Sequence, residues 1–124
     1  MHVSLSRQDM LQAVQRCQNI VERRHTIPIL SNILLDADNG FLHFSATDLE
    51  VGIQTRCIAG IKESGRLTVS ARKLFDVIKE LDVEAEVELE TLDGFLMLKS
   101  GRSKFRLAIM DPEEFPDMKQ DEDG

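Results

Sequence analysis

The sequence predicts an α+β fold in which one structural pattern runs twice along the chain. Each pass reads as a strand, an amphipathic helix and three further strands, over Met1–Ile58 and then Gly65–Met110. The two helices are expected at Gln8–Val21 and Ala71–Leu81, at matching places in the two passes. Such a domain can place two equivalent helices side by side on a sheet, which favours an extended surface over a catalytic pocket.

Length and composition indicate a single domain with its own core. The chain has 124 residues, within the usual range for one domain. Its two cysteines, Cys17 and Cys57, form no CxxC pair, which favours reduced structural thiols in a cytoplasmic protein. The sequence shows neither an apolar run of about 18 residues nor a signal-peptide pattern, so we expect no membrane partner.

Charge is distributed unevenly along the sequence. The net charge is −7, but Asp111–Gly124 carries seven acidic residues against the single basic residue Lys119. The preceding residues are therefore close to neutral, and Met1–Leu35 has a small basic excess. This distribution is compatible with a weak contact to a polyanion through one face, which the overall charge alone would argue against.

The first pass begins with a helix-start signal, because Ser6 can cap a helix and Asp9 follows three residues later. Apolar residues then recur at helical spacing: Met10, Leu11, Val14, Cys17 and Val21. The opposite face is polar and free of acids beyond the first turn: Gln12, Gln15, Arg16, Gln18 and Asn19. This face fits either an ordinary solvated surface or one that lies against a polyanion.

The rest of the first pass predicts antiparallel strands. Ile27–Leu35 is a long apolar run typical of a buried strand. Asp38-Asn39-Gly40 predicts a hairpin turn into the strand Phe41–Ala46, and Val51–Ile58 alternates again. Lys62–Gly65 is expected to be the loop that divides the two passes.

The second pass repeats this order, with Ser70 as the helix cap. Its helix has an apolar stripe of Leu74, Phe75, Ile78 and Leu81. Glu84–Glu90 alternates as a strand. Tight turns at Asp93-Gly94 and Ser100–Ser103 connect it to Phe95–Lys99 and then to Lys104–Ile109. Its glutamates can pair across strands with Lys99, Lys104 and Arg106. The strand Lys104–Ile109 also fits an exposed edge that accepts another chain.

The residue types that commonly support catalysis do not form a recognisable motif in this sequence. Asp48 and Glu50 are two positions apart, as in a metal or acid–base pair, but Asp48 follows a strand and fits a turn cap better. His2, His25 and His43 share no zinc-ligand spacing with each other or with the cysteines. We expect no catalytic residue, no cofactor and no metal.

Four segments in register resemble one family. They are Arg24–Asn32, Thr47–Glu50, Ser70–Asp76 and Ser100–Phe105, and the pair Phe115-Pro116 fits as well. In this order the chain is similar to the amino-terminal domain of the bacterial sliding clamp, the beta subunit of DNA polymerase III. The resemblance covers essentially the whole sequence.

The resemblance implies the DNA-clamp fold, with two pseudo-symmetric halves, each with one helix packed on antiparallel sheet. In that family the helices line a pore, three such domains form a subunit, and two subunits close a homodimeric ring around double-stranded DNA. The ring gives the replicative polymerase processivity, serves as a scaffold for replication and repair proteins, and is not an enzyme. Residues 1–118 would be the first domain and 119–124 the start of a linker. The domains that bind polymerase and clamp loader would be absent.

The resemblance also implies residue roles. Arg24 matches an arginine that contacts DNA in the family, and further pore-facing candidates are Gln12, Gln15, Arg16, Arg72 and Lys79. The candidates for the subunit interface are Lys73, Arg102, Lys104, Phe105 and Leu107. Phe105 and Leu107 would then be more exposed here than in the ring. Lys104 takes the place of a common arginine, which keeps the charge but loses a bidentate fork.

Two other functions compete with the clamp. One is a stand-alone protein-interaction module that uses the edge strand Lys104–Ile109 and has no role on DNA. The other is a small hydrolase or nuclease that uses Asp48 and Glu50.

Overall fold

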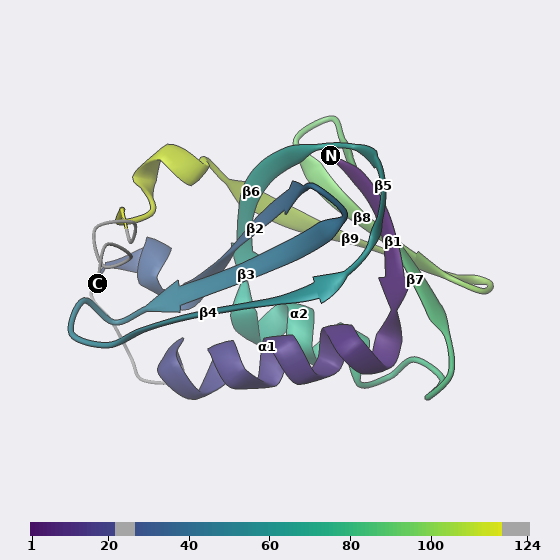
Figure 1. Cartoon of the computed structure of the whole chain (residues 1–124), viewed down its shortest axis with the longest axis horizontal. Helices are drawn as coiled ribbons and strands as arrows, with labels where there is room; N and C mark the ends of the chain where they lie inside the picture. Colours follow the sequence, from purple (N-terminus) through teal and green to yellow (C-terminus); the bar gives the residue numbers. More distant parts are fainter. Residues whose placement is uncertain (22–26, 118–124) are drawn as a thin grey trace.

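The computed structural model describes residues 1–21 and 27–117 (Figure 1). The first part of the chain contains β1 (His2–Ser6), α1 (Arg7–Val21), a 3₁₀ helix (Pro28–Ser31), β2 (Asn32–Asp38), β3 (Phe41–Thr47) and β4 (Gly52–Ile58). The second contains β5 (Gly60–Glu63), β6 (Gly65–Ser70), α2 (Ala71–Ile78), β7 (Glu86–Leu92), β8 (Phe95–Ser100), β9 (Ser103–Met110) and a 3₁₀ helix (Pro112–Glu114).

The predicted repeat is confirmed. The series β1, α1, β2, β3, β4 corresponds in order to β6, α2, β7, β8, β9. The strands form one antiparallel sheet of order β4-β3-β2-β6-β9-β8-β7-β1-β5. In this order β1 pairs with β7 of the second half, and β6 pairs with β2 of the first. Each half therefore completes its sheet with the first strand of the other half.

The sheet curves strongly, and the two helices lie side by side along one side of it (Figure 1). Only Ala59 separates β4 from β5, and β5 pairs with β1, so the two ends of the strand order are joined through the chain. One continuous core lies between the helices and the sheet, and it includes Val14, Cys17, Leu74 and Ile78 from the helices. Burial of these stripes fixes which helix faces remain exposed.

The predicted turns at Asn39-Gly40 and Asp93-Gly94 are confirmed as hairpin turns. Asn39 and Gly40 have φ of 53° and 84°, and Asp93 and Gly94 have 53° and 83°. These positive φ values at both central positions are typical of a two-residue hairpin turn whose twist matches that of the strands. The turns fix the register of β2 with β3 and of β7 with β8.

The prediction of one long strand over Ile27–Leu35 was wrong. Residues Pro28–Ser31 form a 3₁₀ helix, and the strand begins only at Asn32. Proline at the first helical position has a suitable φ and needs no hydrogen-bond acceptor for its nitrogen. The apolar residues Ile29 and Leu30 pack instead against Phe115 in a second, small cluster.

Two other boundaries also differ from prediction. The expected loop Lys62–Gly65 is mostly strand, because β5 continues to Glu63 by pairing with β1 and β6 begins at Gly65. The second helix ends at Ile78, although Leu81 is buried as its stripe predicts. Residues 79–81 continue as a turn, with Leu81 N donating to the carbonyl of Ile78.

Candidate nucleic-acid interface

Both helices begin with the side-chain caps that the sequence predicts. Ser6 Oγ accepts a hydrogen bond from the backbone N of Asp9 at 3.1 Å. Ser70 Oγ accepts one from the backbone N of Lys73 at 3.2 Å. Each cap satisfies an otherwise unpaired N–H group and sets the residue at which the helix starts. The two starts determine which side chains point away from the core.

The outward face of α1 is polar and nearly uncharged. Its exposed residues are Gln8, Asp9, Gln12, Gln15, Arg16 and Asn19. Gln18 differs from prediction, because it is partly buried and its Oε1 has no hydrogen-bond partner within the described part of the chain. The exposed face beyond the first turn therefore contains one arginine, amides and no carboxylate.

The outward face of α2 and the turn that follows it are more highly charged. Its exposed residues are Arg72, Lys73, Asp76, Lys79 and Glu80. Lys79 Nζ lies 3.6 Å from Asp76 Oδ1 and 5.2 Å from the centre of the Phe75 ring. Over residues 1–21 and 27–117, no ion pair to Arg72 is found. Of the two predicted pore-facing cations in this region, Arg72 and Lys79, Arg72 is thus the more available.

Arg7 links the two helices, a role that the local sequence does not indicate. Its Nε donates to the carbonyl of Ile78 at 3.2 Å and its Nη2 to that of Lys79 at 3.3 Å. Its backbone N donates to the carbonyl of Ala85 at 3.0 Å. The buried guanidinium therefore caps the C-terminal end of α2, where carbonyls lack intrahelical partners. Its partners are more than seventy positions away, so sequence spacing could not reveal them.

Strand β9 leaves much of one edge free in the described chain. It pairs with β8 along most of its length but with β6 only through Ile109 and Met110. Residues 103–108 therefore have a strand on one side only. Exposed Arg102 and Lys104 lie at this edge, and Phe105 is half-buried against the core.

The side chain of Leu107 is more buried than its implied interface role led us to expect. Its side chain is only 5% exposed and belongs to the main core of the domain. In β9 the side chains alternate, and the inward positions pack against the domain itself. Leu107 therefore offers almost no side-chain surface to a second chain, and its place in the candidate interface rests on its backbone at the free edge of β9.

The predicted pairing of the acidic strand with basic neighbours is confirmed for Lys99 only. Lys99 lies opposite Glu88, and its Nζ is 3.5 Å from Glu90 Oε1. The guanidinium of Arg106 instead lies 4.4 Å from the centre of the Phe95 ring. The described residues show no ion pair between Lys104 and the acidic strand.

Asp48 has the turn role that the sequence favours. Its Oδ1 accepts hydrogen bonds from the backbone N of Glu50 at 3.0 Å and of Val51 at 2.8 Å. Leu49, which lies between Asp48 and Glu50, has a positive φ of 82°. The carboxylate thus holds a tight β3–β4 connection, so its geometry is that of a turn cap.

The cysteines are buried and unpaired. Burial raises the pKa of both Cys17 and Cys57 to about 12, and the carboxylate of Asp9 contributes to the rise at Cys57. A thiol with such a pKa stays protonated at neutral pH and is a poor nucleophile. Both cysteines therefore act as small apolar core residues, as predicted.

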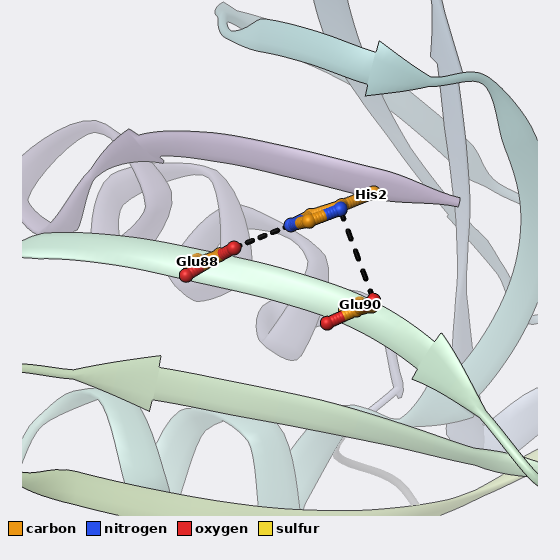
Figure 2. Close-up of side chains that lie close together, drawn as sticks. All are labelled: His2, Glu88 and Glu90. Carbon is orange, nitrogen blue, oxygen red and sulfur yellow. Dashed lines mark hydrogen bonds and ion pairs between the residues drawn. The ribbon is translucent and has the colours of Figure 1, made fainter.

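The structure brings together one group of possible metal ligands that the sequence analysis missed. His2, Glu88 and Glu90 each place a ligand atom within 4.8 Å of the others (Figure 2). Zinc-ligand spacing among the histidines and cysteines does not reveal this group, because its ligands lie on two paired strands. The sequence pattern Glu-x-Glu indicates such a site only when the strand register places a histidine opposite it.

The remaining predictions fall outside what the structure tests. Arg24 and His25 lie outside the described residues, as does the whole of the stretch 119–124 expected to begin a linker. Within the described part, no helix is long and apolar enough to cross a membrane.

The chain matches known proteins in both sequence and structure. Residues 1–119 match the family model described as DNA polymerase III beta subunit, N-terminal domain. The chain is 40% identical over 123 residues to a beta sliding clamp of Caulobacter vibrioides (strain NA1000 / CB15N), covering 98% of this chain and 33% of that protein. It is 36% identical over 121 residues to the beta sliding clamp of Pseudomonas aeruginosa, covering 97% and 33%.

Solved structures show the same relation. A structure of the Caulobacter crescentus pol III beta superposes with a TM-score of 0.93 at 40% identity, over 98% of this chain and 33% of that one. A Pseudomonas aeruginosa DNA polymerase III subunit beta superposes at 0.90 with 33% identity, over 96% and 32%. The chain thus spans about a third of the length of the relatives it matches.

Proposed function

Because the chain belongs to the family of the DNA polymerase III beta subunit, as its N-terminal domain, we propose that it is the first domain of a ring-shaped sliding clamp. The ring encircles duplex DNA and keeps the replicative polymerase on its template. The domain itself has a binding role and no catalytic one. The whole ring, its homodimeric state, its cytoplasmic location and its contacts with polymerase and clamp loader are parts of this proposal.

The observation that carries the proposal is the polar surface made by α1 and α2 together. The helices lie side by side (Figure 1). The outward face of α1 is mainly amides with one arginine, and that of α2 and the following turn carries three cations and the acids Asp76 and Glu80. Phosphate contacts supply non-specific affinity for DNA, and that affinity falls as salt rises. A clamp that slides needs such contacts to be few, and a nearly neutral face provides few. Closure of the ring, rather than tight binding, would keep the protein on DNA.

Within this surface, Gln15, Arg16 and Arg72 are the proposed phosphate contacts. All three are exposed on the outward faces of the helices. Lys79 is a weaker candidate because it must leave Asp76 and the Phe75 ring to reach a phosphate. Arg24 remains a proposal that rests on the family resemblance.

The free edge of β9 is the proposed subunit interface. Arg102 and Lys104 surround the half-buried Phe105, and α2, which carries Lys73, packs against β9. An unpaired strand edge can accept a strand from another chain by backbone hydrogen bonds. In the proposed ring this partner strand belongs to the second subunit.

The test is an NMR titration of the 124-residue chain with a short linear duplex at low salt and then at physiological salt. We expect Kd weaker than about 10⁻⁴ M at physiological salt, since one domain makes only part of the ring's contacts. Shifts should centre on Gln15, Arg16 and Arg72. Arg16→Gln and Arg72→Gln should each weaken the low-salt binding.

Arg66→Gln is the matched control. Arg66 is also an exposed arginine, but it lies on β6 and faces Asp36 at 3.8 Å. Its replacement should leave the titration unchanged. Shifts that centre on residues 104–109, or binding that resists salt, would contradict the pore assignment and favour the stand-alone interaction module.

A further inference from the structure

We propose that His2, Glu88 and Glu90 form a binding site for a divalent transition-metal ion, and that Zn²⁺ is the ion that suits it best. The site lies on the sheet, where the first strand of one half meets the second half (Figure 2). It lies on different elements from the proposed DNA surface, and the inference does not depend on the clamp function.

Strand register explains why these three side chains meet. His2 on β1 lies directly opposite Glu90 on β7, and Glu88 is two residues before Glu90 on the same strand. Residues two apart on a strand point to the same face, and opposite residues of paired strands are near neighbours. Two regular strands thus hold the three donors in place.

The geometry needs only side-chain adjustment to hold an ion. Figure 2 shows the imidazole between the carboxylates, with Nε2 against Glu88 Oε2 and Nδ1 3.8 Å from Glu90 Oε2. All three ligand atoms lie within 4.8 Å of one another. An ion at their centre would lie within about 2.8 Å of each, compared with roughly 2.0–2.2 Å for Zn–N and Zn–O bonds. Side-chain rotations can close that difference without a change of strand register.

The site is intermediate between core and open surface. The side chains of His2, Glu88 and Glu90 are 20%, 37% and 31% exposed. An ion could therefore enter from solvent and keep water as a fourth ligand, a coordination that zinc commonly adopts. A shallow groove beside the cluster is lined by His2, Glu86, Glu88 and Lys99.

The donor chemistry selects the class of ion. Two carboxylates and one imidazole offer a mixed oxygen and nitrogen set with a charge of −2, which balances a divalent cation. Imidazole suits zinc and its neighbours, whereas Mg²⁺ and Ca²⁺ prefer oxygen ligands alone.

Lys99 competes directly with the ion, and the charge of Lys62, which lines the same groove, also acts on Glu88. Lys99 Nζ lies 3.5 Å from Glu90 Oε1 and must move aside when a metal binds. A proton on the imidazole competes as well, because only the free nitrogen can coordinate. These two competitors predict how binding should respond to mutation and to acid.

The experiment is isothermal titration calorimetry of the 124-residue chain with Zn²⁺ at neutral pH in a buffer free of chelators. We expect one ion per chain, with weaker binding as the pH is lowered. His2→Gln, Glu88→Gln and Glu90→Gln should each weaken binding at least about tenfold. Lys99→Gln should strengthen it, because it removes the competitor for Glu90.

Two controls match the ligands in type. His43→Gln replaces another partly buried histidine, and Glu84→Gln replaces an exposed acid just before the same strand, outside the groove. Both should leave affinity unchanged. Imidazole NMR signals of the unmutated chain provide a readout that does not depend on variant folding, since only those of His2 should shift with Zn²⁺. No uptake of Zn²⁺, or equal uptake by the three ligand variants, would overturn the proposal.

Discussion

The two halves share one topology but use matching positions differently. Ser6 and Ser70 stand at the same place and cap their helices in the same way. The residues after them diverge, because Arg7 reaches across to the end of α2 while its counterpart Ala71 simply fills the core. The halves are therefore equivalent in outline and unequal in the contacts that join them.

This inequality shows that neither half is a complete unit. The first strand of each half pairs with the other half's sheet, and Arg7 joins the start of one helix to the end of the other. The contacts between halves thus fix how the two outward helix faces lie relative to each other. A surface that depends on both helices requires these contacts to be intact.

The largest effect on this comparison should come from Arg7→Met. The variant keeps the apolar stem but leaves the carbonyls of Ile78 and Lys79 without their charged donor in a partly buried site. We expect the free energy of unfolding to fall by about 1.5–3 kcal/mol, measured by urea denaturation. Arg16→Met on the exposed face of α1 is the control, and equal stability of the two variants would contradict the linking role.

Removal of the two helix caps should have a smaller effect on stability, and one that differs between the caps. Ser6→Ala and Ser70→Ala should each lower the free energy of unfolding by about 0.5–2 kcal/mol. The loss at Ser70 should be the larger, because Asp9 still favours the N-terminus of α1 whereas Lys73 opposes that of α2. Thermal or urea unfolding measures both, with exposed Ser64→Ala as control. A larger loss at Ser6 would show that side-chain charge in the first turn does not distinguish the helices.

The smallest expected effect is on the acid dependence of stability, through the contact of Glu88 on β7 with His2 on β1. The pKa of Glu88 is lowered in the folded chain, chiefly by its hydrogen bond with His2. A lowered folded-state pKa contributes stability that is present above the unfolded value of about 4.3 and is lost as pH falls through the folded value. Unfolding midpoints should therefore fall less steeply with acid in Glu88→Gln than in the unmutated chain.

Glu84→Gln is the control for this measurement, because Glu84 is exposed and precedes β7. It should keep the steeper acid dependence of the unmutated chain. If Glu88→Gln and the unmutated chain lose stability in parallel below about pH 4, the contact of Glu88 with His2 contributes nothing to acid sensitivity.

Much of the fold followed from local patterns in the sequence. Helical spacing located the buried stripes of α1 and α2, and Asn39-Gly40 and Asp93-Gly94 located two hairpins because their backbone geometry suits positive φ. Prediction failed where packing decided the local structure. The apolar residues 29 and 30 fitted a predicted strand, but they form part of a 3₁₀ helix and pack against Phe115.

The candidate surfaces divide in the same way. The sequence predicted the polar outward face of α1, because helical periodicity alone separates its two sides. It could not show that Asp76 holds Lys79 or that Leu107 lies in the core, since both depend on side-chain placement.

By itself the sequence determined the repeated order of elements, the helix caps, the hairpin turns and the family resemblance, because each depends on residues close together along the chain. Only the tertiary structure decided which strand of one half completes the sheet of the other and which carbonyls accept hydrogen bonds from Arg7. It also decided that His2 lies beside Glu88 and Glu90. The β1–β7 pairing and the contacts of Arg7 and His2 join residues more than seventy positions apart. Strand register, which local sequence does not specify, brings the histidine and the glutamates together.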